Sequence, residues 1–228
     1  MSLRCDAFAT SDLAEAEQHL QRNYGDVALR AETLSYEETS VGDERFALGE
    51  LRVRGGYRAA ADVAAVTIAV AERGYRWSTG DARGDGVDPV LFQPGAPMSC
   101  EVSDAQVRVV VLPLPALTDV ARTVYNDDRI DVRFDAERIP DAALRRAWRS
   151  TVDWAFGSTA SLSSELVRAS VFRALAVTTL RRSPSPVIGA TAPARRGVCT
   201  SPIGVRCASL RTTPHFRSRS PTRHPLPE

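Results

Sequence analysis

The chain lacks lysine, and it contains few cysteines and no long apolar run. All 29 basic residues are arginine, which we interpret as a mark of GC-rich coding rather than of function. The four cysteines show no framework spacing, as is typical of reduced cytosolic thiols. No segment approaches the roughly 18–20 apolar residues of a membrane helix, and the first residues do not resemble a signal peptide. We therefore expect a soluble, cytoplasmic protein without a membrane partner.

Histidine is also scarce, which limits the metal and catalytic sites that the chain can build. Of three histidines, only His19 lies within residues 1–180, whereas a metal site in a β-barrel usually takes several imidazoles and a carboxylate. No Gly-x-Ser-x-Gly elbow occurs. We predict no catalytic residues, no metal and no other cofactor. The cysteines and histidines near the end also lack the short Cys-x(2–4)-Cys spacing of structural zinc; they are Cys199, Cys207, His215 and His224.

Charge and proline content both change at Leu180. Residues 1–180 carry 20 arginines and 27 acidic residues, whereas residues 181–228 carry nine arginines and a single acid, Glu228. Eight of the 14 prolines lie in this second segment, where they remove backbone donors and disfavour helix. The sequence therefore predicts an acidic folded domain over residues 1–180 and a disordered Arg/Pro/Ser-rich tail over residues 181–228.

A short helix is predicted over residues 10–24. Thr10 or Ser11 is the expected capping residue, and Gly25 is expected to end the helix. The apolar residues of this segment repeat at helical spacing and form one stripe, made of Leu13, Ala16, Leu20 and Tyr24.

The following hundred residues alternate between apolar and polar positions, which is the period of strands with one buried face. Turn signals separate the strands, at Gly55-Gly56, Gly80-Asp81, Gly84-Asp85-Gly86 and Pro94-Gly95. Many short strands without helices between most of them favour an antiparallel barrel or sandwich over about residues 27–135. The alternating sets are Leu51/Val53, Val66/Ile68/Val70, Tyr75/Trp77, Val90/Phe92, Val107/Val109/Val111 and Ile130/Val132/Phe134.

Two helices are predicted after the strands, at about residues 140–157 and 161–180, with Pro140 and Ser161 as their start signals. The second helix carries apolar residues around most of its circumference, so other parts of the protein must cover it on more than one side. Either it lies inside the fold, or its outer stripe is a homodimer interface. The candidate interface residues are Val167, Val171 and Ala174.

Three aromatic residues on the predicted strands are candidates for a ligand-binding pocket. They are Tyr75, Trp77 and Phe92. Most such rings pack in a core, but aromatic side chains also line small-molecule pockets in the mouths of barrels. The sequence alone leaves both interpretations open.

Several short segments resemble a known regulatory family. They are Asp12-Leu-Ala-Glu-Ala16 with Tyr24-Gly25, Leu48-Gly49-Glu50-Leu51, Phe92-Gln-Pro94-Gly95, Val132-Arg133-Phe134, Trp148-Arg149 and Glu165-Leu-Val-Arg168. Over about residues 8–180 the chain resembles the AraC-binding-like regulatory domain of AraC/XylS-type transcriptional regulators. The resemblance implies an α+β fold: a cupin-like antiparallel β-barrel or jelly roll with a short N-terminal helix and two C-terminal helices.

The resemblance also implies a function. In that family the domain serves effector binding and dimerisation, and about a hundred residues with two helix-turn-helix units follow it. Only 48 residues follow Leu180 here, and no helix-turn-helix can be drawn through them. We therefore expect the regulatory part of an AraC-type regulator, truncated or frameshifted before its DNA-binding domain. Its expected partners are a small-molecule effector and a second copy of the chain, without specific DNA binding.

The alternative is a stand-alone cupin-like enzyme or small-molecule-binding protein. The segment from Phe92 to Met98 resembles the second cupin motif only faintly, because Met98 stands about where that motif has a histidine. A metal-dependent cupin enzyme would purify with a stoichiometric metal ion, so elemental analysis separates the two interpretations.

Overall fold

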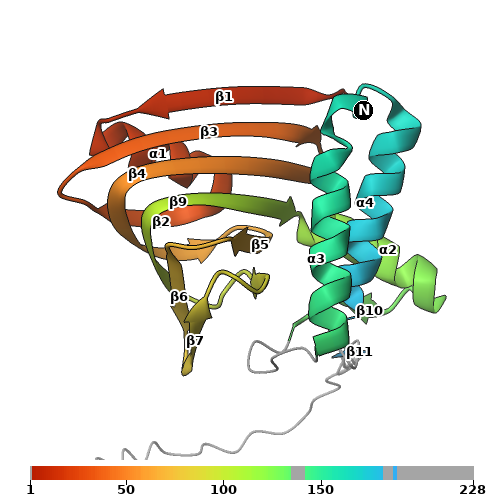
Figure 1. Cartoon of the computed structure of the whole chain (residues 1–228). Helices are drawn as coiled ribbons and strands as arrows, with labels where there is room; N and C mark the ends of the chain where they lie inside the picture. Colours follow the sequence, from red (N-terminus) through yellow and green to blue (C-terminus); the bar gives the residue numbers. More distant parts are fainter. Residues whose placement is uncertain (1, 135–141, 182–186, 189–228) are drawn as a thin grey trace, which may run out of the picture. The chain divides into compact units, whose positions relative to one another are not determined.

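The chain folds around one large antiparallel sheet, with helices at both of its ends (Figure 1). The structure is a computed structural model that describes residues 2–134, 142–181 and 187–188. Helix α1 (Leu13–Tyr24) packs at one end, whereas α2 (Leu114–Tyr125), α3 (Ala142–Gly157) and α4 (Glu165–Leu180) gather at the other. In this described part of the chain, no helix is both long and apolar enough to cross a membrane.

Two long strands form the centre of the sheet, β4 (Phe46–Val63) and β9 (Met98–Leu112), which pair antiparallel with each other. The sheet order is β1-β3-β4-β9-β5-β8, with β2 beside β4, and with β6 between β9 and β7. The antiparallel α+β architecture is as predicted, and the sheet is not closed. The other strands are β1 (Arg4–Thr10), β2 (Gly25–Arg30), β3 (Leu34–Asp43), β5 (Val66–Ala71), β6 (Tyr75–Thr79), β7 (Ala82–Asp85) and β8 (Val90–Phe92).

The pair Gly55-Gly56, predicted as a turn, lies inside β4 and bends it. The register with β9 shifts between Val53 and Gly56. Gly55 has φ +75°, and a Cβ atom on it would lie 2.6 Å from the carbonyl oxygen of Thr33. Across the bulge, Asp104 has φ 44°, and its carboxylate accepts a hydrogen bond from the Gly55 amide at 3.0 Å. The glycines therefore bend one continuous strand instead of separating two, as bulges do elsewhere.

Two hydrophobic cores lie along the strands. The sheet core is enclosed by strands and α1, and the helix core lies between strands and α2, α3 and α4. Strands β5 and β9 contribute to both cores, because successive side chains of a strand point to opposite faces. Thus Ala69 and Val109 belong to the sheet core, whereas the adjacent Ile68 and Val110 belong to the helix core.

The N-terminal helix was predicted correctly, but its cap was not. Asp12 caps α1, since its carboxylate accepts hydrogen bonds from the amides of Ala14 and Glu15 at 2.8 and 3.0 Å. Thr10 instead belongs to β1, a strand that the sequence did not indicate, and its hydroxyl donates to the Glu15 carboxylate. The cap shifts by one or two residues because strand β1 extends to the start of the helix.

The C-terminal helices also differ in detail from the prediction. A short 3₁₀ turn, η1 (Thr159–Ser161), precedes α4, which begins at Glu165 rather than near Ser161. Helix α2 was not predicted, although its buried residues Leu117 and Ala121 are four positions apart, as on one face of a helix. It interrupts the strand series expected to run from β9 to Phe134.

The last predicted strand does not join the main sheet. Its apolar residues Ile130, Val132 and Phe134 are all buried, but in the helix core. Only β10 (Ile130–Asp131) is a strand, and it pairs with β11 (Val187–Ile188). Apart from Arg181 and β11, the predicted tail lies outside the described residues.

A buried ion pair joins the turn between β3 and β4 to α4. The Asp43 carboxylate is fully buried, and its Oδ2 lies 3.5 Å from Nε of Arg168 and 2.5 Å from a guanidinium nitrogen of Arg45. Burial opposes ionisation of Asp43, but hydrogen bonds from Arg45 and the charge of Arg168 hold its pKa below the ordinary value. Arg168 also donates to the carbonyl oxygens of Leu162 and Ser163 at 2.6 and 2.9 Å. Such partners offset the cost of burying the charges.

Substitution of Gly55 by alanine should lower the free energy of unfolding by about 1–3 kcal/mol, because the added Cβ meets backbone in a left-handed conformation. Urea denaturation of the full chain measures this. The control is Gly157→Ala at the end of α3, where a Cβ meets no atom within 4 Å. Equal stability of both variants would show that the bend tolerates a side chain.

Candidate functional site

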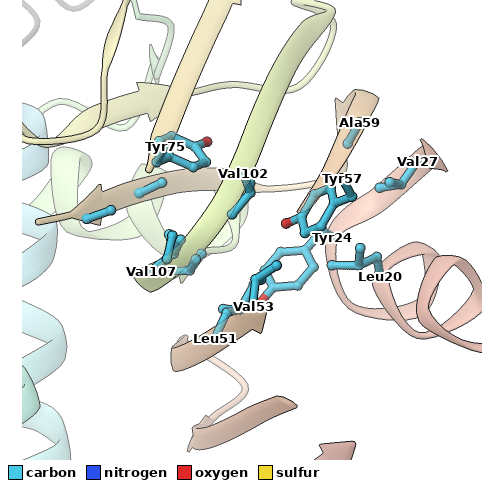
Figure 2. Close-up of a cluster of buried hydrophobic side chains, with 14 of the residues drawn as sticks. Leu20, Tyr24, Val27, Leu51, Val53, Tyr57, Ala59, Tyr75, Val102 and Val107 are labelled. Atoms are coloured by element: carbon cyan, nitrogen blue, oxygen red, sulfur yellow. The ribbon is translucent and has the colours of Figure 1, made fainter. Parts of the chain in front are cut away.

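A small cavity of about 80 Å³ lies inside the sheet core. Its wall comes from α1 and from β2, β4, β5, β6, β8 and β9. Alternation along β4 places Tyr57 and Ala59 on this wall, while Arg58 and Ala60 face outward and are exposed. The cavity is therefore a property of the bent sheet together with helix α1, whose Leu20 also lines it (Figure 2).

The structure brings together two of the three aromatic residues predicted to line a pocket. Tyr75 and Phe92 are buried and line the cavity. Trp77 is only partly buried and is not part of the cavity wall. Its ring packs edge-on against Phe92 with centroids 6.1 Å apart, and its indole donates to the Asp85 carbonyl oxygen at 2.9 Å. Ligand binding by these residues stays a prediction.

Tyr57 and Cys100 belong to the same wall, and the sequence did not single them out. Figure 2 shows the hydroxyls of Tyr57 and Tyr75 directed into the interior between the labelled side chains. Burial raises the pKa of Tyr57 and Tyr75 well above the ordinary value, and it raises the pKa of the Cys100 thiol to about 11. At neutral pH these groups are therefore uncharged, and Cys100 is a hydrogen-bonding partner of Tyr75.

A buried polar cluster lies behind one wall of the cavity and is centred on Glu38. Its carboxylate accepts hydrogen bonds from the hydroxyls of Tyr24 at 2.7 Å and Tyr36 at 2.5 Å. Nε2 of His19 lies 3.0 Å from the same carboxylate, and the ring of Phe8 stacks on His19 with centroids 4.0 Å apart. Burial, followed by the charge of Glu38, raises the pKa of Tyr24 and of Tyr36 above their ordinary values. The cluster fixes α1 against β1 and β3.

The Glu38 cluster could not be located from the sequence. Tyr36 and Glu38 are two residues apart on β3 and so share a face, but an acid at this spacing is far more often exposed. Besides the local Tyr36, Glu38 is partnered by Tyr24 and His19 of α1, and the positions of these two residues depend on the tertiary fold. His19 is thus paired with Glu38 in a structural contact. Within the described residues, no group of three or more His, Cys, Asp or Glu could hold a metal ion.

The three predicted interface residues differ in exposure. Val171 is fully buried in the helix core, so it has no surface to offer a second chain in this conformation. Val167 and Ala174 are only partly buried. The exposed side of α4 instead carries Leu166, with 77% of its surface accessible. Self-association remains a prediction, and Leu166 is its better probe.

The comparisons with known proteins bear on the fold. No protein-family model and no curated protein matches the chain. Its structure is similar to that of the AraC-like transcriptional activator CuxR, with a TM-score of 0.55 and 12% identity, covering 77% of this chain and 69% of that one. Weaker likenesses include oxalate decarboxylase from Bacillus subtilis, with a TM-score of 0.29 and 15% identity over 45% of this chain and 35% of that one. The chain thus shares its fold with an AraC-like activator.

Replacing Glu38 by glutamine should lower the free energy of unfolding by about 1–3 kcal/mol, because two hydroxyls and an imidazole lose a charged acceptor. Urea denaturation gives the difference. The matched control is Glu37→Gln, since Glu37 is the exposed neighbour on the same strand and its loss should change stability by no more than about 0.5 kcal/mol. If both variants are as stable as the parent, the Glu38 cluster does not hold α1.

Proposed function

We propose that about residues 1–180 form a regulatory domain of the AraC type, which binds a small-molecule effector in the cavity of the sheet core. The observation that carries the proposal is a cavity inside a sheet whose fold is shared with an AraC-like activator. The wall chemistry favours binding over catalysis, because its tyrosine and cysteine side chains are held in their neutral forms. Small-molecule sites are commonly concave and apolar with a few placed polar groups, as here.

The proposal includes a route from the cavity to the helices. Ala69 and Val109 line the cavity, and the next residues on the same strands, Ile68 and Val110, pack in the helix core. Close-packed cores transmit displacement because they contain few voids. A ligand that displaces β5 or β9 therefore acts directly on the packing of α2, α3 and α4.

Self-association through the outer side of α4 is the second part of the proposal. Leu166, Ala174 and Val177 lie at spacings of eight and three residues along this helix and keep exposed or partly exposed surface. Trp154 on the neighbouring α3 is also 46% exposed. Burying these apolar side chains in a two-fold contact would be favourable. Because α4 belongs to the helix core, such a contact would couple assembly to the cavity.

The effector part of the proposal is tested by filling the cavity. A library of small molecules is screened against the full chain by thermal denaturation, and each hit is repeated on Ala59→Leu and Ala60→Leu. These neighbours lie on opposite faces of β4, with Ala59 in the cavity wall and Ala60 exposed. We expect stabilisation by a true ligand, following RT ln(1 + [L]/Kd), to disappear only in Ala59→Leu. Hits that are indifferent to Ala59→Leu would place the binding site elsewhere.

The assembly part is tested by sedimentation velocity of the full chain with Leu166→Asp. A dimer that becomes a folded monomer is the expected result, since the substitution places a charge in an apolar contact. Val124→Asp is the control, because Val124 is an exposed apolar residue of α2, with 44% of its surface accessible. A monomeric parent, or an unchanged dimer in Leu166→Asp, contradicts an interface on this side of α4.

A further inference from the structure

The chemistry of the cavity wall restricts the class of molecule that it can hold. The wall consists of 16 described residues, and none of them is an arginine, histidine, aspartate or glutamate. Nine of the 16 are alanine, valine or leucine. Its polar groups are three tyrosine hydroxyls, one threonine hydroxyl and one thiol, from Tyr24, Tyr57, Tyr75, Thr67 and Cys100.

A charged ligand would find no counter-ion on this wall. Glu38 lies behind Tyr24, and both of its oxygens already accept hydrogen bonds, from Tyr24, Tyr36 and His19. A cation would have to compete with these donors, and an anion would be repelled by the carboxylate. Removing an ion from water without a partner is strongly unfavourable. The arginines of the adjoining strands, Arg58 and Arg76, lie on the outer face and are engaged by Glu101.

One hydroxyl of the wall is poised to bind a polar group. Tyr57 is 7% exposed and lines the cavity, and no hydrogen bond of its hydroxyl is found among the described residues. Its neighbour Tyr75 is directed into the same interior (Figure 2) and is hydrogen-bonded to Cys100. The Tyr57 oxygen is not among the buried side-chain atoms that lack a partner in the described part of the chain, so it is accessible and can donate to a ligand acceptor at this point.

We infer that the cavity takes an uncharged, largely apolar molecule with a single hydrogen-bonding group, such as a small alcohol or ketone. Its apolar part would lie against Leu20, Val27 and Ala59, and its polar atom at the Tyr57 hydroxyl. This inference rests on the proposed function, since it names the ligand class of the same cavity. The volume of about 80 Å³ is below the roughly 150 Å³ of a cavity that admits benzene, so only the smallest alcohols and ketones fit without movement, and a four-carbon alcohol requires a small displacement of the wall. Rings require side chains of the wall to move, and Met98 has the most flexible side chain among the wall residues.

Three compounds with one branched carbon skeleton test the ligand class, namely isobutanol, isobutyrate and isobutylammonium. Each is titrated at millimolar concentrations into the full chain at pH 7.5, and binding is followed by protein-observed NMR. We expect saturable binding of isobutanol and at least tenfold weaker binding of both charged compounds. Ala59→Leu should abolish the isobutanol shifts, and Ala60→Leu should leave them unchanged. Ala69→Val, which also narrows the cavity, replaces Ala59→Leu should that variant unfold.

The role of Tyr57 has its own variant, Tyr57→Phe, which removes only the hydroxyl. We expect isobutanol to bind this variant about three- to tenfold more weakly than it binds the parent chain. Isobutane, which has the same carbon skeleton without the hydroxyl, should bind both proteins with equal affinity. Equal isobutanol affinity in Tyr57→Phe would overturn the assignment of this hydroxyl.

The remaining outcomes separate the ligand class from the proposed function. Equal or tighter binding of isobutyrate or isobutylammonium, lost in Ala59→Leu, overturns the inference of a neutral ligand and leaves the effector cavity intact. If none of the three compounds, and no member of the wider library, loses binding in Ala59→Leu, then both the inference and the effector cavity are wrong.

Discussion

The fold depends on one antiparallel pair of strands, β4 and β9, that is long enough to serve two cores. The pair continues past the bulge at Gly55 because Asp104 supplies a carboxylate for the Gly55 amide and itself adopts a positive φ. One end of the pair carries Tyr57 and Val102 into the sheet core, and the other carries Leu48 and Val110 into the helix core. Without the bend, β4 and β9 could not stay hydrogen-bonded to each other along their length while one end of the pair faces the sheet core and the other end faces the helix core.

Two buried polar clusters fix the helices on this scaffold. Glu38 holds α1 through Tyr24 and His19, and Asp43 holds α4 through Arg168. Each carboxylate is almost fully buried and has hydrogen-bond or ion-pair partners from more than one part of the chain, which is the condition under which a buried charge is tolerated. Because a mispositioned helix would leave these carboxylates without partners, the clusters favour one arrangement of helix and sheet over others.

The two faces of the sheet have opposite chemistry. On the outer face, Glu101 accepts from Arg58 at 3.2 Å and from Arg76 at 2.5 Å; these exposed pairs add little stability, because water and salt screen them. The inner face at the same strands carries the buried Tyr57 and Tyr75 and the partly buried Cys100, which are neutral. This separation gives the cavity its proposed selectivity, since the charges of this region lie on the side facing water.

The sequence by itself determined the antiparallel strands, the N-terminal helix and the two C-terminal helices, because alternation and helical spacing are local properties of the chain. It also led to Tyr75 and Phe92, which share the buried face of their strands. Only the tertiary structure decided that Gly55 bends a strand, that Val171 is buried and that the sheet stays open. It also decided that Glu38 and Tyr57 face inward. These outcomes depend on partners distant in sequence, such as Asp104 for Gly55 and His19 for Glu38, and no local pattern specifies such contacts.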